Sequence, residues 1–342
     1  MFGARFFLSD SPGMNISESA MFTAGNIPWT KLDTLQYTAR SGPGVVVVQQ
    51  KAGPRIYAFG GYTVFSKEFR QRHPSAPVTD PPEQKTVYRR VWDAFQAYLP
   101  RWSYDSPDAK KVNLYPPVHV VEPDSCCFLD VENGPGEWTV LDAKMRSKRM
   151  AACAILLDHS SVVICGGFSD RHYCDDMFGC ELFDLNTHTF SSFSNMIESR
   201  FAHAGVHYNG TIIVLGGRGV EIPAFDIVRK TTCEQFDPVV GKWKLIAPLQ
   251  HARSHFGAAV IDNNIYAVGD VLDIEMYDGS TWASVAMLPT VHLNASAVCL
   301  GGKLVTFGRR EDDVHTYDPL TGTWQVLCKM PFGVDQIIAV SF

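Results

Sequence analysis

The sequence predicts an all-β protein assembled from a repeated four-stranded antiparallel unit. Composition is the first indication, because 27 Gly and 20 Pro among 342 residues require many turns, and many turns favour short strands over long helices. The second is a recurring order of features: two short apolar runs, a Gly end, an aromatic–Asp pair and a closing Trp or Phe. The third is that the apolar runs are rich in Val, Ile and Tyr, which is typical of strands buried on both faces.

The repeat has three landmarks that recur along the chain. The second apolar run ends at Gly60, Gly166, Gly216, Gly269 and Gly308. The aromatic–Asp pairs are Phe183-Asp184, Phe236-Asp237, Tyr277-Asp278 and Tyr317-Asp318, and the closing aromatic residues are Phe190, Trp243, Trp282 and Trp324. Asp beside Pro, Asn or Gly predicts a tight hairpin turn, because the Asp side chain caps its own turn. The closing aromatic residue is predicted to be an apolar plug between neighbouring units.

The fixed order of Gly end, aromatic–Asp pair and Trp resembles the kelch-repeat family, whose repeats form the blades of a β-propeller. The resemblance covers most of residues 35–342 and implies one propeller domain over residues 1–342. Three departures occur: Gly269-Asp270 and Gly308-Arg309 replace a Gly–Gly pair, and Phe190 replaces Trp.

Spacing of the Gly ends predicts the number of blades. Most intervals are near the kelch period of roughly 50 residues, but the first is about twice that. We attribute the excess to an insertion over residues 62–120 with an amphipathic helix near 85–99. Five internal blades and one closing blade then make six. Seven blades, with strands hidden in residues 85–120, are the alternative.

The two ends of the chain are predicted to share the closing blade. Residues 1–33 contain FFLS and the strand-like AMFTAGNIPWTKLD, and residues 333–342 contain IIAVSF. Joined, these segments supply the four strands of one split blade, the form of ring closure that the resemblance implies.

Charge and cysteine usage exclude several classes of function. The net charge is −6, from 30 basic and 36 acidic residues, which argues against a nucleic-acid binder or an anionic-membrane binder. No run approaches the roughly 18 apolar residues of a membrane span. Nine scattered Cys and the lack of an apolar leader predict free thiols and a cytoplasmic protein, with the nucleus as an alternative.

The most regular polar feature is an Arg before the first strand of each repeat. It recurs as Arg40, Arg149, Arg200 and Arg253, and His292 takes the equivalent place. We expect a cationic ring at one mouth of the central channel, where Arg offers forked donors to the carboxylates of an acidic peptide. The equally weighted alternative is that these residues cap backbone carbonyls or pair with acids between blades. The resemblance implies that small hydroxyl residues on this face contact partner peptides, and here Ser41 and Ser254 follow two of the Arg.

Loops after the Gly ends form the second candidate surface. They open with Tyr62, Phe168 and Arg218, and loops on one rim of a rigid scaffold commonly carry binding specificity.

Metal and enzyme patterns are weak. His172, Cys174, Cys180 and His188 lack the spacing of a structural zinc module. Glu181, Asp184 and His188 come near, without matching, the iron site of kelch-like specifier proteins. We therefore predict no metal, no cofactor and no catalytic residue.

The prediction for function is a non-catalytic protein–protein interaction module that binds a partner peptide with acidic residues at the propeller mouth. The resemblance implies substrate recognition for a ubiquitin ligase complex, through a partner, because the repeats occupy the chain and no BTB or F-box domain is expected. The alternative is a small-molecule enzyme of the kelch-like type, a sugar epimerase or specifier protein, using the channel mouth.

Overall fold

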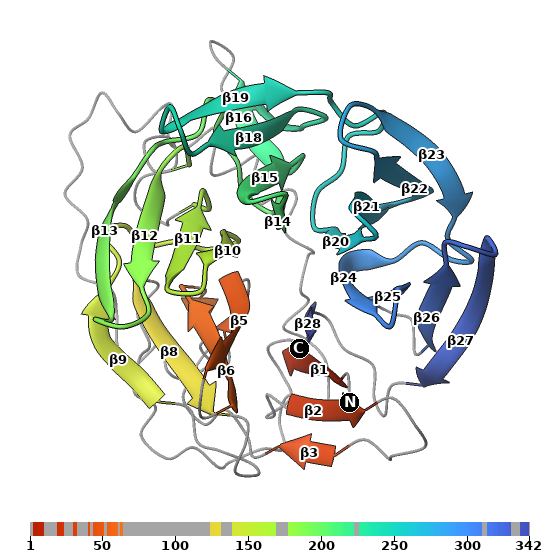
Figure 1. The fold of residues 1–342 in the computed structure, drawn as a ribbon, viewed down its shortest axis with the longest axis horizontal. Coiled ribbons are helices and arrows are strands. Elements are labelled where there is room, and N and C mark those ends of the chain that lie inside the picture. The colour runs from red at the N-terminus through yellow and green to blue at the C-terminus, as the bar shows by residue number, and fades with distance from the viewer. Residues whose placement is uncertain are drawn as a thin grey trace, which may run out of the picture.

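The computed structural model describes thirteen segments of the chain: residues 3–9, 19–23, 30–32, 40–41, 44–50, 53–60, 62–63, 124–130, 139–168, 177–221, 226–309, 313–329 and 336–341. These segments contain strands and no helix, and the sheets stand around a central axis as the blades of a β-propeller (Figure 1). The prediction of an all-β propeller is confirmed. None of these residues forms a helix with the length and hydropathy needed to cross a bilayer. The helix predicted near residues 85–99 lies outside the described segments.

Five four-stranded antiparallel blades have described side chains. The first comprises β5 (Gly44–Gln50), β6 (Gly53–Phe59), β8 (Ser125–Asp130) and β9 (Thr139–Lys144). The second comprises β10 (Cys153–Asp158), β11 (Ser161–Cys165), β12 (Cys180–Asp184) and β13 (Thr189–Phe193). The third comprises β14 (Ala204–Tyr208), β15 (Thr211–Leu215), β18 (Cys233–Asp237) and β19 (Lys242–Ile246). The fourth comprises β20 (Gly257–Ile261), β21 (Asn264–Gly269), β22 (Val271–Tyr277) and β23 (Trp282–Met287). The fifth comprises β24 (Leu293–Leu300), β25 (Lys303–Arg309), β26 (Asp313–Asp318) and β27 (Thr323–Lys329).

A further four-stranded sheet joins the two ends of the chain, and its backbone pairing is described. Its order is β28 (Gln336–Ser341), β1 (Gly3–Ser9), β2 (Ser19–Thr23) and β3 (Thr30–Leu32). Phe6 on β1 pairs with Ala339 on β28 and with Ala20 on β2. The innermost strands of the six sheets contact one another in the order β5, β10, β14, β20, β24 and β28, and β28 contacts β5.

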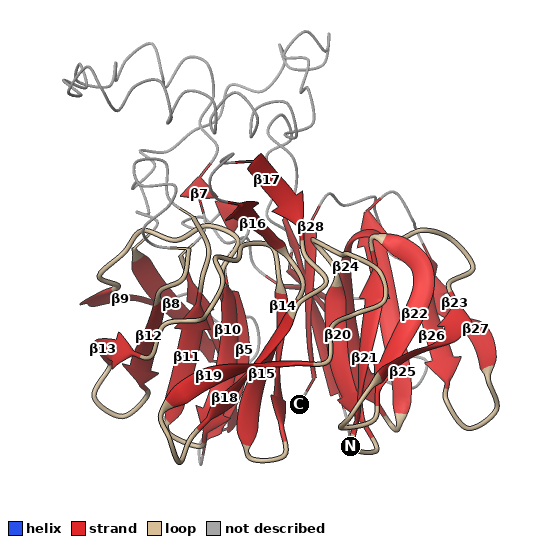
Figure 2. Cartoon of the chain, turned by 90° about the horizontal axis from the view of Figure 1, so that it is seen from above, coloured by secondary structure: helices blue, strands red, loops and turns tan. Residues whose placement is uncertain are grey.

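Two short additional sheets lie at one face of the propeller. They are β4 (Arg40–Ser41) with β7 (Tyr62–Thr63), and β16 (Arg218–Glu221) with β17 (Asp226–Arg229). Figure 2 shows β7, β16 and β17 above the ends of the blades. This is the face at which the Gly-ended strands stop, and we call it the Gly face.

The apolar cores lie between successive blades. Ile155 and Val163 of the second blade share a buried cluster with Ile212, Val214 and Trp243 of the third. Trp243 is 7% exposed, and its Nε1 donates to the carbonyl of Ser194, 2.8 Å away in the preceding connection. Trp282 donates in the same way to Ala247 at 3.0 Å. The predicted role of these Trp residues as plugs between blades is confirmed.

Each aromatic–Asp pair ends the third strand and caps the outer hairpin as predicted. The Oδ1 of Asp184 accepts the N–H groups of Asn186 and Thr187 at 2.9 and 2.8 Å. Asp278 does the same for Ser280 and Thr281, both at 2.8 Å. Hydrogen bonds that favour the carboxylate, the largest from the Thr281 N–H, lower the pKa of Asp278 to about 2.

The Gly ends exist because the next blade's backbone approaches closely. A Cβ on Gly166 would lie 2.3 Å from the carbonyl oxygen of Arg200, and Gly166 has a φ of +60°, a left-handed conformation that Gly adopts readily. The N–H of Gly167 donates to the same oxygen at 2.9 Å. Where Asp270 replaces the second Gly, its N–H still donates to the carbonyl of His292 at 2.9 Å.

The connections between blades are hydrogen-bonded to one another. The N–H of Ala202 donates to the carbonyl of Ala151, the N–H of His255 to Ala202, and the N–H of Ala295 to His255, at 2.8, 2.8 and 3.0 Å. Arg149, Arg200 and Arg253 stand within these connections, a few residues before the first strands β10, β14 and β20.

Candidate functional site

Three of the predicted Arg residues are buried within their own blades. Arg149 is 3% exposed, and Arg200 and Arg253 are 0% exposed. Each guanidinium faces a Glu on the third strand of its blade. The ion pairs are Arg149–Glu181 at 3.0 Å, Arg200–Glu234 at 3.0 Å and Arg253–Glu275 at 2.8 Å. Each Nη1 also donates to the carbonyl of the blade's Gly end, at 2.8 Å for Gly166, 2.8 Å for Gly216 and 3.3 Å for Gly269.

The same Glu side chains hold the connection that enters the blade. Glu234 accepts the N–H of Ile197 at 2.6 Å and that of Glu198 at 3.1 Å. Glu275 accepts the N–H groups of Gln250 and His251 at 2.5 and 3.1 Å. Each carboxylate is therefore satisfied by one Arg and two backbone donors, which is the condition under which a buried charge pair is tolerated.

The expected cationic ring needs correction at these positions. The side chains of Arg149, Arg200 and Arg253 point into the blades, where their forked donors are used by Glu and by backbone carbonyls. This agrees with the alternative in which the recurring Arg caps backbone carbonyls or pairs with acids, except that each Glu lies in the same blade as its Arg and not between blades. A guanidinium enclosed in this way is not presented to a peptide at the mouth.

No Glu is named above as the partner of these Arg residues, although the spacing of the Glu residues is regular enough to predict them. Glu181, Glu234 and Glu275 each stand three residues before the Asp of the aromatic–Asp pair, in CELFD, CEQFD and IEMYD. The blade β24–β27 has VHTYD instead, so His315 takes the place of Glu.

His292 takes the place of Arg in that same blade, so a His–His pair stands where the other blades have Arg–Glu. His292 is 0% exposed, and its ring centroid lies 5.2 Å from that of His315. Its Nδ1 lies 3.2 Å from the Thr306 hydroxyl. Desolvation and, second, the neighbouring His315 lower the pKa of His292 to about 4. His292 is therefore uncharged at neutral pH and belongs to the blade interior.

The two candidate surfaces predicted from the sequence meet in the structure. In three of the repeats the residue after the Arg pairs with the residue that opens the Gly-end loop. The pairs are Ser41 with Tyr62, Met150 with Phe168, and Phe201 with Arg218. Phe168 is 6% exposed and packs edge-to-face on Phe201 with ring centroids 5.0 Å apart. Phe168 is therefore part of the packing between two connections. Arg40 pairs with Thr63 through the backbone.

Arg218 and Ser254 belong to a polar cluster on the Gly face between the third and fourth blades. Arg218 donates from Nε to the Ser254 hydroxyl at 3.1 Å. Asp270 accepts the Ser254 N–H at 2.8 Å and pairs with Arg229 at 3.4 Å. Arg218 and Arg229 are directly opposite each other on β16 and β17. Within this cluster, which we call the Arg218 cluster, Arg229 pairs with Asp270 and Arg218 bonds the hydroxyl of Ser254, which is itself held by Asp270.

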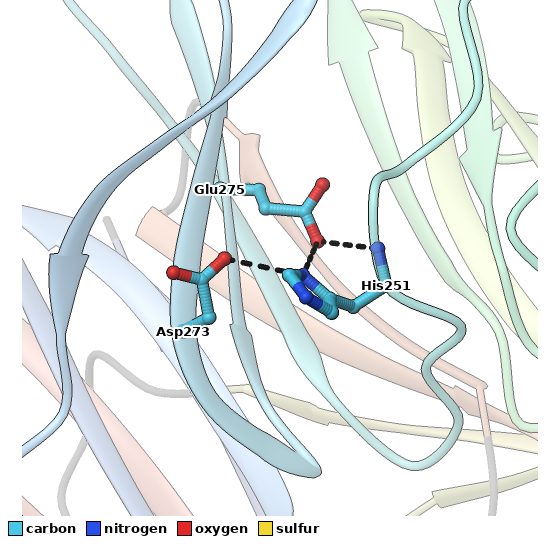
Figure 3. Close-up of side chains that lie close together, drawn as sticks. All are labelled: His251, Asp273 and Glu275. Carbon is cyan, nitrogen blue, oxygen red and sulfur yellow. Dashed lines mark hydrogen bonds and ion pairs between the residues drawn. The ribbon is translucent and has the colours of Figure 1, made fainter.

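One group of described residues has the geometry of possible metal ligands. His251, Asp273 and Glu275 bring ligand atoms within 4.8 Å of one another (Figure 3). The Nδ1 of His251 lies 3.3 Å from Asp273 and 3.4 Å from Glu275. However, Arg253 also contacts both carboxylates, at 3.6 and 2.8 Å. Its positive charge stands where a cation would bind, so this group is an extension of the Arg253–Glu275 pair.

The residues considered for zinc or iron do not converge where the structure describes them. Glu181 is engaged by Arg149, and Asp184 caps the outer hairpin. His188 stacks on Phe183 with centroids 6.0 Å apart. Cys180 lies on β12, directly opposite Cys165 on β11. His172 and Cys174 lie outside the described residues.

Comparison with known proteins gives relatives of modest identity. No family model matches the chain. It is 29% identical over 163 residues to the spermatocyte protein spe-26 of Caenorhabditis elegans, covering 43% of this chain and 28% of that protein. It is 25% identical over 198 residues to beta-scruin of Limulus polyphemus, covering 49% and 21%. It is 26% identical over 195 residues to Kelch-like protein 38 of Rattus norvegicus, covering 54% and 32%.

The chain therefore spans no more than about a third of the length of these relatives. The matches nevertheless agree with the repeat and with the blades. The ordered Gly ends, the Asp-capped hairpins and the Trp plugs, together with these relatives, show a β-propeller that is similar to kelch-repeat proteins.

Proposed function

We propose that the protein is a non-catalytic interaction module that binds an acidic peptide segment at the Arg218 cluster on the Gly face. The observation that carries the proposal is an exposed guanidinium beside a second one, since Arg229 is 44% exposed. Arg218 and Arg229 face each other across β16 and β17, and like charges directly opposite on paired strands repel. Asp270 pairs with Arg229, and a carboxylate from a partner would bring a second anionic group to this cationic cluster.

The geometry of the cluster suits recognition at a rim. Arg229 is 44% exposed, so its guanidinium is accessible to a partner. Ser254 is 1% exposed and fixed by Asp270 and Arg218, so it orients Arg218. One fixed and one accessible guanidinium form a forked receptor for carboxylates. Partner-binding roles for Arg40, Ser41 and Tyr62, on the neighbouring β4–β7 sheet, remain part of this proposal.

The proposal also covers the number of blades in the propeller and the complex in which the module acts. The contacts of β28 with both β24 and β5 support a ring of six blades closed by the sheet β28-β1-β2-β3, and an experimental structure with seven radial sheets would contradict it. Substrate recognition within a ubiquitin ligase complex, which the resemblance to kelch proteins implies, is the proposed role, and the cytoplasm is the proposed location. Capture of a ligase component by the purified chain would test that role, and its absence from such captures would contradict it.

The peptide proposal is tested by binding of a fluorescein-labelled Glu-rich peptide, followed by fluorescence anisotropy. The same peptide with Gln at every Glu should bind far more weakly, because the forked receptor requires carboxylates. Arg218→Glu/Arg229→Glu should weaken binding of the Glu-rich peptide by about tenfold or more. Equal binding of the two peptides would contradict the proposal.

The matched control is Lys244→Glu. Lys244 is exposed on the outer strand β19, so this change removes a positive charge at a distance from the Gly face. It should leave binding of the Glu-rich peptide nearly unchanged. A loss as large as that of the double Arg variant would mean that net charge alone governs binding.

A further inference from the structure

A row of thiols crosses the second blade and meets a histidine from the third. Cys153 on β10 is directly opposite Cys165 on β11, and Cys165 is directly opposite Cys180 on β12. The Sγ of Cys153 lies 3.0 Å from Nε2 of His203, which precedes β14. A thiol at this distance from an imidazole nitrogen can transfer its proton and become a nucleophilic thiolate.

Glycines of both blades leave the space that this pair occupies. A Cβ on Gly205 would lie 2.9 Å from the Cys153 Sγ. A Cβ on Gly166 would lie 2.9 Å from the Cε1 of His203, and one on Gly217 would lie 2.6 Å from its Cβ. The His203 ring is thereby confined between two Gly ends with its Nε2 directed at the thiol. Its Nδ1 contacts no hydrogen-bond partner among the described residues.

Cys153 differs from the other thiols of the row in exposure, and the pKa values of Cys153 and Cys165 are shifted in opposite directions. Cys153 keeps part of its surface exposed, whereas Cys165 and Cys180 are buried. Burial opposes ionisation of Cys153, but hydrogen bonding from Cys165 and the charge and hydrogen bond of His203 outweigh it and lower the pKa of the Cys153 thiol to about 5. Burial, followed by the neighbouring thiols, raises the pKa of Cys165. The row thus contains a partly exposed thiol of lowered pKa next to a buried thiol of raised pKa.

We propose that Cys153 is a peroxide-sensitive modification site, with His203 as its base and Cys165 as its resolving thiol. In the first step the Cys153 thiolate attacks one oxygen of hydrogen peroxide. An S–O bond forms, the O–O bond breaks, and the departing hydroxide takes the proton held by His203 and leaves as water. In the second step Cys165 attacks the sulfenic sulfur. An S–S bond forms, the S–O bond breaks, and a second water leaves with the Cys165 proton.

Alkylation kinetics of the intact chain test the thiolate. Cys328 is the matched reference, because it has the same intermediate exposure as Cys153 while burial and Asp313 raise its pKa to about 11. At pH 7 iodoacetamide should modify Cys153 about tenfold or more faster than Cys328, since the gain in thiolate fraction is only partly offset by lower intrinsic nucleophilicity. Similar rates at the two residues would overturn the proposal, and this comparison requires no variant.

The role of His203 is tested by His203→Gln, which should slow Cys153 alkylation at pH 7 and move the midpoint of its pH profile upward. His207→Gln, on the exposed side of the same strand β14, is the control and should change neither. An unchanged profile in folded His203→Gln would overturn the assignment of His203 as the base.

Peroxide treatment followed by mass spectrometry tests the resolving thiol. Cys153 and Cys165 lie on one tryptic peptide, residues 150–171, so their disulfide appears as the loss of two hydrogens from that peptide. Cys165→Ser should abolish this product and leave a sulfenic acid on Cys153 that dimedone traps. A Cys165–Cys180 disulfide, or no oxidation of Cys153 while Cys328 is oxidised, would overturn the proposal.

Discussion

The blade β24–β27 differs from the three blades before it in how its entry connection is held. In the second, third and fourth blades a buried Arg joins the connection to a Glu on the third strand. In the blade β24–β27 these positions are His292 and His315. The connection differs too. In the fourth blade Glu275 accepts the N–H groups of Gln250 and His251. The equivalent positions before His292 are Pro289 and Thr290. Pro289 has no N–H, so its position needs no acceptor.

In the blade β24–β27 the Arg and the Glu are replaced together by His292 and His315. A joint replacement avoids leaving either charge alone and uncompensated in this buried place. Around the two His residues three buried polar atoms have no hydrogen-bond partner among the described residues, namely Nε2 of His292, Nδ1 of His315 and the hydroxyl of Thr290. The blade β24–β27 is therefore held less completely at its entry than its neighbours.

The largest expected contrast between the two kinds of blade lies in their Trp plugs. Trp243 is 7% exposed and bonds Ser194, whereas Trp324 is only partly buried and its Nε1 has no partner among the described residues. Trp243→Ala should lower the free energy of unfolding by about 3–5 kcal/mol, as expected for deletion of a buried aromatic side chain. Trp324→Ala should cost clearly less. Urea unfolding measures both, and equal losses would mean that the plugs are equivalent.

The pH dependence of stability sharpens the same comparison. The pKa of His292 is lowered to about 4 in the folded chain and is near 6.5 when unfolded. The contribution of His292 to the free energy of unfolding is therefore fully present above about pH 6.5 and is lost as the pH falls through 4. Linkage predicts a loss of about 2 kcal/mol between pH 7 and 5.

His292→Gln is the variant that isolates this effect, because Gln does not titrate and can still bond the Thr306 hydroxyl. Stability of the variant should fall less steeply between pH 7 and 5 than that of the unaltered chain. His159→Gln is the control, since His159 is exposed in the β10–β11 turn. Parallel pH profiles for all three chains would show that His292 is not the group responsible.

Much of the fold follows from residues that act locally. Asp278 caps a turn within its own hairpin, and Gly166 needs no side chain where the next connection passes. Such features recur at fixed spacing and can be predicted from one sequence. The partner of Arg200 is different, because Glu234 becomes its neighbour only when the third strand is placed in register. The recurring Arg can be recognised from the sequence, but the burial of its side chain cannot. The charge and the forked donors of Arg therefore predict an exposed cationic ring.

The Arg218 cluster could be predicted in part for the same reason. Arg218 and Ser254 stood out by their repeat positions, whereas Arg229 and Asp270 join them through the β16–β17 pairing and the substitution of Asp for the second Gly. Cys153 and His203 come from different blades, and the contact between them depends on the approach of β10 to β14. No spacing within one repeat indicates it.

The central claim, that the recurring Arg holds its blade together, is tested most directly by a double-mutant cycle on Arg200 and Glu234. Each single change to Ala should lower the free energy of unfolding by about 3–5 kcal/mol, because it leaves the opposite charge buried and uncompensated. The double variant should lose much less than the sum of the two. Additive small losses, with stability close to that of the unaltered chain, would contradict the claim and return Arg200 to the exposed ring.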